Sequence, residues 1–153
     1  IINYTNNYID TTRIVIDNKG IPSTTASDLL ASNVDSTVGD IILINYGLNE
    51  AYRGVDVSLF KQDLSSLVQQ FVDYNKVVVL QTPNIVGTDV EWGTELYKYV
   101  EIIKQVAIDK HTYLQDKFAY SVPLEDSIHP SNEGYNTQGI ELAGILNNIY
   151  YTI

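Results

Sequence analysis

Two short apolar runs separated by an amphipathic stretch most constrain how this chain can fold. Residues 40–45 (D-I-I-L-I-N) and 76–81 (K-V-V-V-L-Q) have the length of strands and are almost continuously hydrophobic, which is typical of strands buried on both faces of a parallel sheet. Between them, Asp56 is a candidate N-cap, and the apolar residues after it recur at helical spacing: Phe60, Leu64, Leu67, Val68 and Phe71. This order predicts two parallel strands joined by a helix.

The rest of the chain continues this alternation. Residues 13–17 (R-I-V-I-D) predict a strand that ends in a turn before Gly20. Further segments are predicted as a short helix at 25–32, a long helix at 93–109, an extended segment at 113–122, and a closing helix that carries Leu142, Ile145, Leu146 and Ile149. We therefore predict an α/β fold with a mostly parallel sheet, in one domain that spans residues 1–153.

The acidic composition limits the partners of the chain. Nine Lys and Arg residues against nineteen Asp and Glu give a formal net charge of −10, which argues against binding to nucleic acid or to an anionic membrane surface. Cysteine is absent, so there are neither disulfides nor thiolate metal ligands, and the apolar runs are too short to span a membrane. Twelve tyrosines favour a carbohydrate-facing protein with an extracellular, cell-surface or virion-associated location.

The strongest candidate for chemistry is the motif D-S-I-H-P at residues 126–130. Proline disfavours the helical conformation at the residue before it, so we expect His129 on an extended loop. From three residues upstream, Asp126 can accept the Nδ1 proton of His129, fix the tautomer and leave Nε2 free to act as a base. The alternative is an exposed carboxylate and an ordinary surface histidine before a helix cap. His111, at the end of a predicted helix, is interpreted as structural.

Four loops are expected to meet at the carboxyl edge of the sheet, where ligands bind in such folds. They contain Gly20, the turn G-L-N-E at 47–50, Pro83 and the D-S-I-H-P motif. The N–H of Gly20 and the amide of Asn49 are candidate donors to a developing oxyanion. Alternatively, Gly20 is only a turn residue and Asn49 only a loop or cap residue. Three further residues of these loops are predicted to contact the substrate: Tyr46, Gly47 and Pro83.

Three of these features, in this order, resemble sequence blocks of the SGNH (GDSL-like) hydrolase family. Gly20 after a predicted strand, the turn at 47–50, and the D-S-I-H-P motif before a helix are similar to the second, third and fifth blocks. Residues 21–30 (I-P-S-T-T-A-S-D-L-L) also resemble the segment that comes after the family's glycine. The resemblance covers the chain from about Arg13 to its C-terminus, and Glu50 departs from it where aspartate is usual.

The resemblance implies a three-layer sandwich with a flavodoxin-like sheet and a serine ester hydrolase that needs no metal or organic cofactor. In this family His129 would be the base, Asp126 would orient it, and Gly20 and Asn49 would form the oxyanion hole. The expected substrates are esters of small acyl groups such as acetyl, often carried by carbohydrates.

The family's first block, G-D-S, which carries the nucleophilic serine, has no match in the chain. Gly39 and Asp40 are followed by Ile41 and begin a strand instead of ending one. Ile1 and the polar segment after it resemble the residues directly downstream of that serine, so we expect the serine and the first strand upstream of Ile1, in a larger chain or complex. Residues 1–153 alone are expected to be inactive, because they lack the nucleophile, and poorly folded, because the absent strand would leave its neighbours with open edges.

Two other functions fit the same sequence. A non-catalytic module that lost the serine would bind glycans in the same cleft, with candidate stacking surfaces at Tyr46, Tyr52, Trp92 and Tyr135. A structural module of a larger extracellular or virion protein would fit the polar composition and the absence of a starting methionine.

Overall fold

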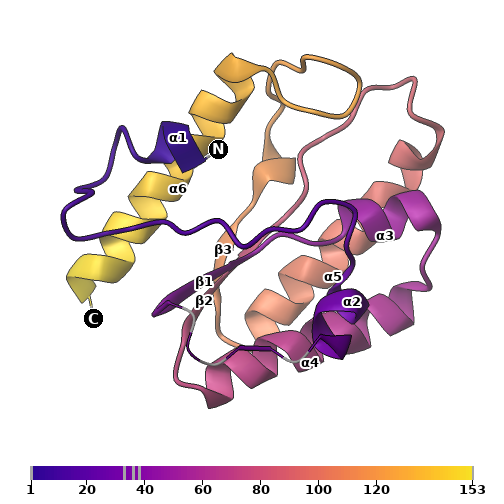
Figure 1. Ribbon diagram of the computed structural model, residues 1–153. Coiled ribbons are helices and arrows are strands. Elements are labelled where there is room, and N and C mark those ends of the chain that lie inside the picture. The colour runs from indigo at the N-terminus through magenta and orange to yellow at the C-terminus, as the bar shows by residue number, and fades with distance from the viewer. Residues whose placement is uncertain (1, 33, 36, 38, 153) are drawn as a thin grey trace.

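The chain is built around a three-stranded parallel sheet, seen in a computed structural model that describes residues 2–32, 34, 35, 37 and 39–152. The strands are β1 (Ile41–Ile44), β2 (Val77–Gln81) and β3 (Tyr113–Gln115), in the order β1-β2-β3 (Figure 1). Because all pairs are parallel, the three carboxyl ends lie at one edge. The strands predicted at 40–45 and 76–81 are confirmed, whereas the segment 113–122 is a strand only in its first three residues.

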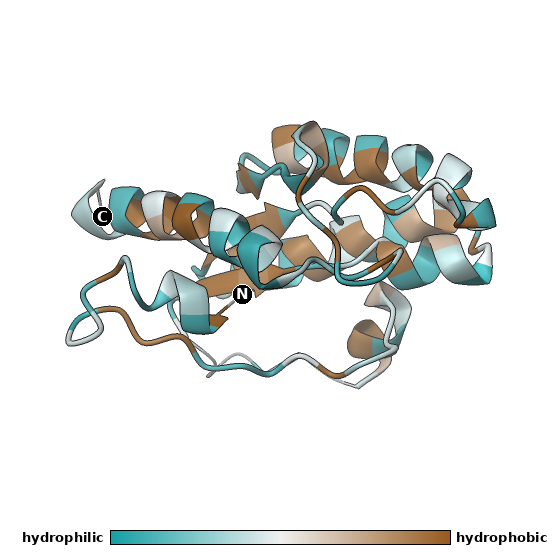
Figure 2. Cartoon of the chain, turned by 90° about the horizontal axis from the view of Figure 1, so that it is seen from above, coloured by the Kyte–Doolittle hydropathy of each residue, from teal (hydrophilic) through white to brown (hydrophobic). Residues whose placement is uncertain are grey.

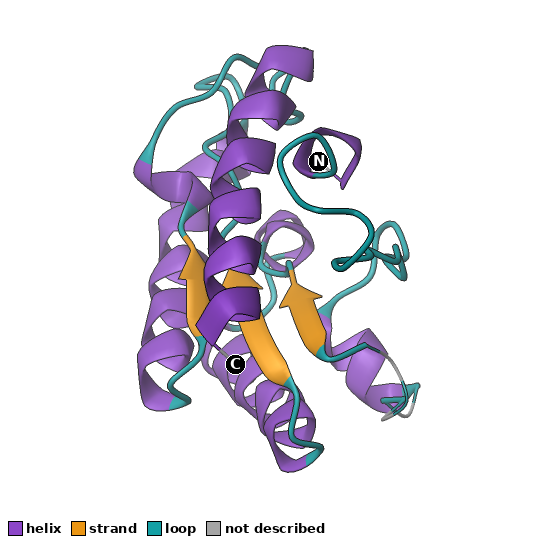
Figure 3. Ribbon diagram, turned by 90° about the vertical axis from the view of Figure 1, so that its left-hand side faces the viewer, coloured by secondary structure: helices purple, strands orange, loops and turns teal. Residues whose placement is uncertain are grey.

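Helices lie on both faces of the sheet, which confirms the predicted three-layer α/β architecture (Figure 3). The α-helices are α1 (Ile2–Thr5), α2 (Ala26–Ala31), α3 (Leu48–Arg53), α4 (Val57–Asp73), α5 (Leu96–Asp109) and α6 (Asn132–Thr152), and the 3-10 helices are η1 (Glu91–Glu95) and η2 (Lys117–Ala119). Among the helices of the described ranges, none combines the length and the apolarity that a membrane crossing requires.

The face covered by α4 and α5 carries the main hydrophobic core. Asp56 caps α4 as predicted, since its side chain accepts hydrogen bonds from Ser58 N at 2.9 Å and Leu59 N at 3.0 Å. The apolar stripe predicted for α4 is buried, and α5 buries a similar stripe: Phe60, Leu64, Leu67, Val68 and Phe71 in α4, and Leu96, Tyr99, Val100, Ile103 and Val106 in α5. Seen from above, hydrophobic strands lie between helices of mixed polarity (Figure 2).

The opposite face is covered by α6 and carries a smaller apolar cluster. Ile14 packs there with Leu142 and Leu146 of α6, and partly buried Ile41 and Leu43 of β1 lie against them. The same face also buries a polar chain of glutamines, in which Gln81 Nε2 donates to Gln115 Oε1 at 2.6 Å and Gln115 Nε2 donates to Gln138 O at 2.8 Å. The two faces of one sheet therefore differ in character.

The prediction of a strand at residues 13–17 is wrong. These residues adopt no regular secondary structure, and within the described ranges β1 pairs only with β2, so the segment joins no sheet (Figure 3). The alternation of the sequence still has an effect, because Ile14 is buried whereas Val15 is 82% exposed. Strand propensity acts through pairing and packing with neighbours, and this segment has the packing without a hydrogen-bonded partner.

Candidate active site

The loops that leave the carboxyl ends of β1, β2 and β3 surround a cavity of about 190 Å³. It is lined by Asn45, Tyr46, Leu48, Asn49, Pro83, Asn84 and Lys117. Three predicted site residues, Asn49, Tyr46 and Pro83, are thus brought together. A larger cavity of about 230 Å³, between α2 and the start of α4, contains none of the predicted site residues.

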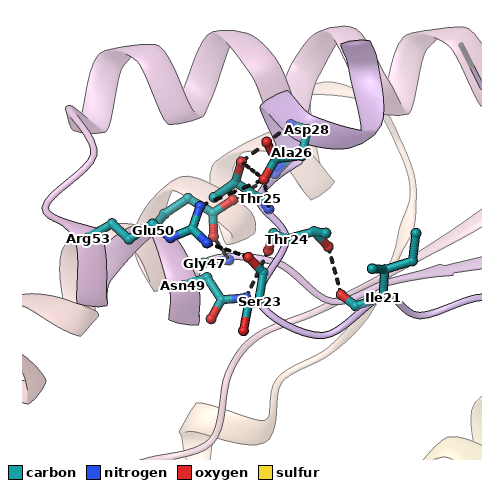
Figure 4. Close-up of polar contacts among 10 residues, drawn as sticks. All are labelled: Ile21, Ser23, Thr24, Thr25, Ala26, Asp28, Gly47, Asn49, Glu50 and Arg53. Carbon is teal, nitrogen blue, oxygen red and sulfur yellow. Dashed lines mark hydrogen bonds and ion pairs between the residues drawn. The ribbon is translucent and has the colours of Figure 1, made fainter. Parts of the chain in front are cut away.

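The loop after β1 is held by the buried carboxylate of Glu50. Gly47 has a φ of 109°, which favours glycine, and a Cβ there would lie 3.0 Å from Ile103 Cδ1. From this turn α3 begins, and Glu50 Oε2 accepts from Gly47 N at 2.7 Å while Oε1 accepts from Ala26 N at 2.8 Å (Figure 4). Glu50 therefore ties the Gly47 turn to the start of α2. Helix α3 was not predicted from the sequence.

The two predicted oxyanion-hole donors both have hydrogen-bond partners. Asn49 Nδ2 donates to Thr24 O at 2.8 Å, which joins α3 to the loop after Gly20 (Figure 4). Its amide has a second hydrogen, and the residue lines the cavity. Gly20 N donates to Asn18 Oδ1 at 3.0 Å. Gly20 must release Asn18 before its N–H can bind an oxyanion.

Asp126 and His129 form a hydrogen-bonded pair on the loop before α6. Asp126 Oδ2 lies 2.8 Å from His129 Nδ1. Asp126 Oδ1 accepts from the backbone N of Ile128 at 2.7 Å and of His129 at 2.6 Å. These hydrogen bonds from the backbone and ring of His129 and from Ile128 lower the pKa of Asp126 to about 2. His129 is 63% exposed, and its Nε2 has no hydrogen-bond partner among the residues described.

The loop after β2 holds this pair in place. Asn84 Nδ2 donates to Ile128 O at 3.0 Å, and Gly87 N donates to Ser127 O at 2.6 Å. Ser131 caps α6, with its Oγ accepting from Gly134 N at 3.3 Å. Because Asn84 also lines the cavity, the Asp126–His129 loop is directly linked to the cavity wall.

Three residues that line the cavity were not predicted from the sequence: Lys117, Asn45 and Asn84. Lys117 is 5% exposed although it is charged. The period of two gave no signal for Lys117, because it groups Lys117 with polar Gln115 and opposite apolar Leu114, whereas in the structure Lys117 begins η2. Within the described ranges no group of three or more carboxylates and histidines could hold a metal ion.

Comparison with solved structures identifies the fold. The chain is similar to the lipase/acylhydrolase of Enterococcus faecalis, with 19% identity over 97% of this chain and 85% of that one and a TM-score of 0.81. It is also similar to a Desulfitobacterium hafniense DCB-2 protein assigned to the lipolytic G-D-S-L family, with 22% identity over 94% and 86% of the two chains and a TM-score of 0.76. This is the SGNH hydrolase fold.

Acetylxylan esterases share the SGNH fold with this chain. Axe2 of Geobacillus stearothermophilus is 21% identical over 96% of this chain and 78% of its own, with a TM-score of 0.73. No family model matches the sequence, and neither does any curated protein. The likeness therefore lies in the path of the backbone, and the SGNH fold recognised from three short motifs is confirmed by the structure as a whole.

Proposed function

We propose that the protein is a serine ester hydrolase that removes small acyl groups, such as acetyl, from a carbohydrate. The observation that carries the proposal is the 2.8 Å contact between His129 Nδ1 and Asp126 Oδ2, on a loop linked to the cavity of Asn49. Neighbours that share the SGNH fold include acetylxylan esterases, which supports an ester substrate.

In the proposed reaction His129 acts as base and Asp126 orients it. Nε2 takes the proton of a serine hydroxyl as the oxygen attacks the ester carbonyl, and Asp126 stabilises the imidazolium. The second amide hydrogen of Asn49 and the N–H of Gly20, once Gly20 has released Asn18, donate to the tetrahedral oxyanion. The imidazolium then protonates the leaving alcohol, and water activated by His129 releases the acyl group from the serine.

We further propose that the nucleophilic serine lies outside residues 1–153, on a strand that pairs with β1. In the described part of the chain, the outer edge of β1 has no strand partner, and Ile14 and Ile16 pack near Ile41 and Leu43 without joining the sheet. A strand placed between them would satisfy the backbone groups of β1. It would be supplied by a larger chain or complex, in an extracellular, cell-surface or virion-associated protein.

The experiment is hydrolysis of p-nitrophenyl acetate by the protein extended upstream of Ile1, beside its His129→Ala variant. We expect the rate of the variant to fall by about 10⁴-fold or more, because the base is removed. Circular dichroism of both proteins controls for folding. Equal rates in two folded proteins, or no hydrolysis by either, would contradict the proposal.

A further inference from the structure

The cavity at the carboxyl edge contains one charged side chain, that of Lys117. The rest of its lining consists of amides and apolar walls, with three asparagines beside Tyr46, Leu48 and Pro83. No carboxylate lines it, although the chain has a formal net charge of −10. The cavity therefore offers a positive charge within an acidic protein.

Lys117 has no counter-ion within the described part of the chain. Its side chain makes no hydrogen bond or ion pair there. The neighbouring carboxylates are engaged elsewhere: Asp116 pairs with Lys104 at 3.0 Å, and Glu141, which acts on Lys117 only through space, accepts from Gln115 Nε2 at 2.9 Å. Burial lowers the pKa of Lys117 to about 8, so its ammonium form predominates at neutral pH.

A buried ammonium group without a counter-ion destabilises the folded protein, and an anion bound in the cavity offsets this loss of stability. One lysine matches the single negative charge of a carboxylate, whereas a phosphate monoester carries nearly two negative charges at pH 7. Asn45, on the exposed rim of the cavity, has an amide without a hydrogen-bond partner in the described ranges, so it is available to donate to a second oxygen. Asn84 is not available, because its Nδ2 already donates to Ile85 O and Ile128 O.

We propose that Lys117 binds a carboxylate of the substrate, so that the protein prefers esters that carry a carboxylate near the scissile bond. This inference rests on the proposed function, because Asn49, the predicted oxyanion donor, lines the same cavity. The carboxylate belongs either to the acyl group, as in the half-ester of a dicarboxylic acid, or to the alcohol, as in an acetylated uronic acid. A salt bridge to Lys117 recognises both in the same way.

The test uses two matched substrate pairs and the protein extended upstream of Ile1. The first pair is p-nitrophenyl hemiglutarate and p-nitrophenyl valerate, which differ by a carboxylate on the acyl group. The second is acetylated glucuronic acid and acetylated glucose, which differ by a carboxylate on the alcohol. We expect kcat/KM to favour the anionic member of one pair and Lys117→Met to lower that ratio by about 10- to 100-fold, as a charge-assisted hydrogen bond is lost.

Lys61→Met is the matched control, because Lys61 is exposed on α4 and its removal changes the net charge equally. We expect its ratios to equal those of the unchanged protein. The pair that responds to Lys117→Met identifies which part of the substrate carries the carboxylate. Ratios that are the same in all three proteins would overturn the inference, while hydrolysis that depends on His129 would leave the proposed function standing.

If no ester is hydrolysed, the proposed function fails, and direct binding decides the inference. Calorimetric titration with glutarate and with glucuronate should then show binding that Lys117→Met abolishes and Lys61→Met retains. If glutarate and glucuronate bind equally to the Lys117→Met and unchanged proteins, or bind to neither, the assignment of Lys117 as a carboxylate-binding residue would be overturned.

Discussion

The segments that follow β1 and β3 each bury one charged side chain, Glu50 in α3 and Lys117 in η2, and they do so in opposite ways. After β1, Glu50 is 1% exposed and accepts hydrogen bonds from two backbone N–H groups. After β3, Lys117 is 5% exposed and has no partner among the described residues. Burial removes water from both groups, but only the charge of Glu50 is compensated by the fold itself.

This difference separates a structural charge from a binding charge. A buried ion whose hydrogen bonds are complete holds its surroundings together, and here it ties α3 to α2. A buried ion without partners destabilises the fold unless something else binds to it. The loop after β1 is therefore a scaffold for Asn49, whereas the loop after β3 supplies an unsatisfied charge to the same cavity.

The largest expected effect concerns a third charged side chain, Asp126, which is exposed although its carboxylate makes three hydrogen bonds. Asp126→Asn should lower kcat/KM for p-nitrophenyl acetate by about 10⁴-fold, because an amide no longer orients the histidine in the required tautomer. The pKa of Asp126 is about 2, so the carboxylate is ionised from pH 4 to 9 and its own protonation should add no pH dependence to the loss in this range. A pH–rate profile of both proteins measures it, and a loss below tenfold would remove Asp126 from the mechanism.

The next largest effect is a gain in stability. Lys117→Met should raise the free energy of unfolding at pH 7 by about 3 kcal/mol, because a buried ammonium with a pKa of about 8 in place of 10.5 destabilises the folded protein. Between pH 8 and 10.5 the folded lysine is neutral while the unfolded one is still charged, so the stability of the unchanged protein rises. The advantage of Lys117→Met should therefore shrink over this window.

Urea unfolding of both proteins at pH 7, 8, 9 and 10 measures this difference directly. Ionisable groups that do not interact with Lys117 contribute equally to both proteins and cancel in the comparison. A destabilised Lys117→Met protein would mean that the lysine is compensated within the fold, and the contrast with Glu50 would disappear.

Glu50→Gln should have the opposite effect on stability to Lys117→Met. Its NH₂ group would face a backbone N–H of either Gly47 or Ala26, so one buried donor loses its acceptor. We expect the free energy of unfolding to fall by about 2 kcal/mol. Thermal unfolding beside Glu91→Gln, an exposed change of the same type, provides the control. No loss relative to that control would show that the carboxylate is not structural.

The smallest expected effect concerns helix α2, whose first residue, Ala26, donates a hydrogen bond to Glu50. Thr25 caps α2 through a capping box, in which Thr25 Oγ1 accepts from Asp28 N at 3.3 Å and Asp28 Oδ2 accepts from Thr25 N at 2.8 Å. Thr25→Ala should lower the free energy of unfolding by about 1 kcal/mol. If both residues stabilise the position of α2, the double variant Thr25→Ala/Glu50→Gln should lose less free energy of unfolding than the sum of the two single variants. A loss equal to that sum would show that the two residues act separately.

Sequence patterns succeeded where a segment's structure depends on its own residues. The stripe of α4, its cap at Asp56 and the apolar runs of β1 and β2 were predicted because periodicity and capping are local properties. The same holds for the pair of Asp126 and His129, since three residues of loop before a proline suffice to bring them together. The prediction failed at 13–17, where a strand requires a partner that local sequence does not supply.

By itself, the sequence determined most of the order of strands and helices, the three motifs that resemble SGNH hydrolases, and two of the loops that line the cavity, those with Asn49 and Pro83. Only the tertiary structure decided that Glu50 is satisfied, that Gly20 is bonded to Asn18 and that Lys117 is buried without a partner among the described residues. The physical reason is that burial and hydrogen bonding of a side chain depend on groups brought near it by other elements. A lysine in a sequence predicts a solvated charge, and only packing by the surrounding elements removes its water.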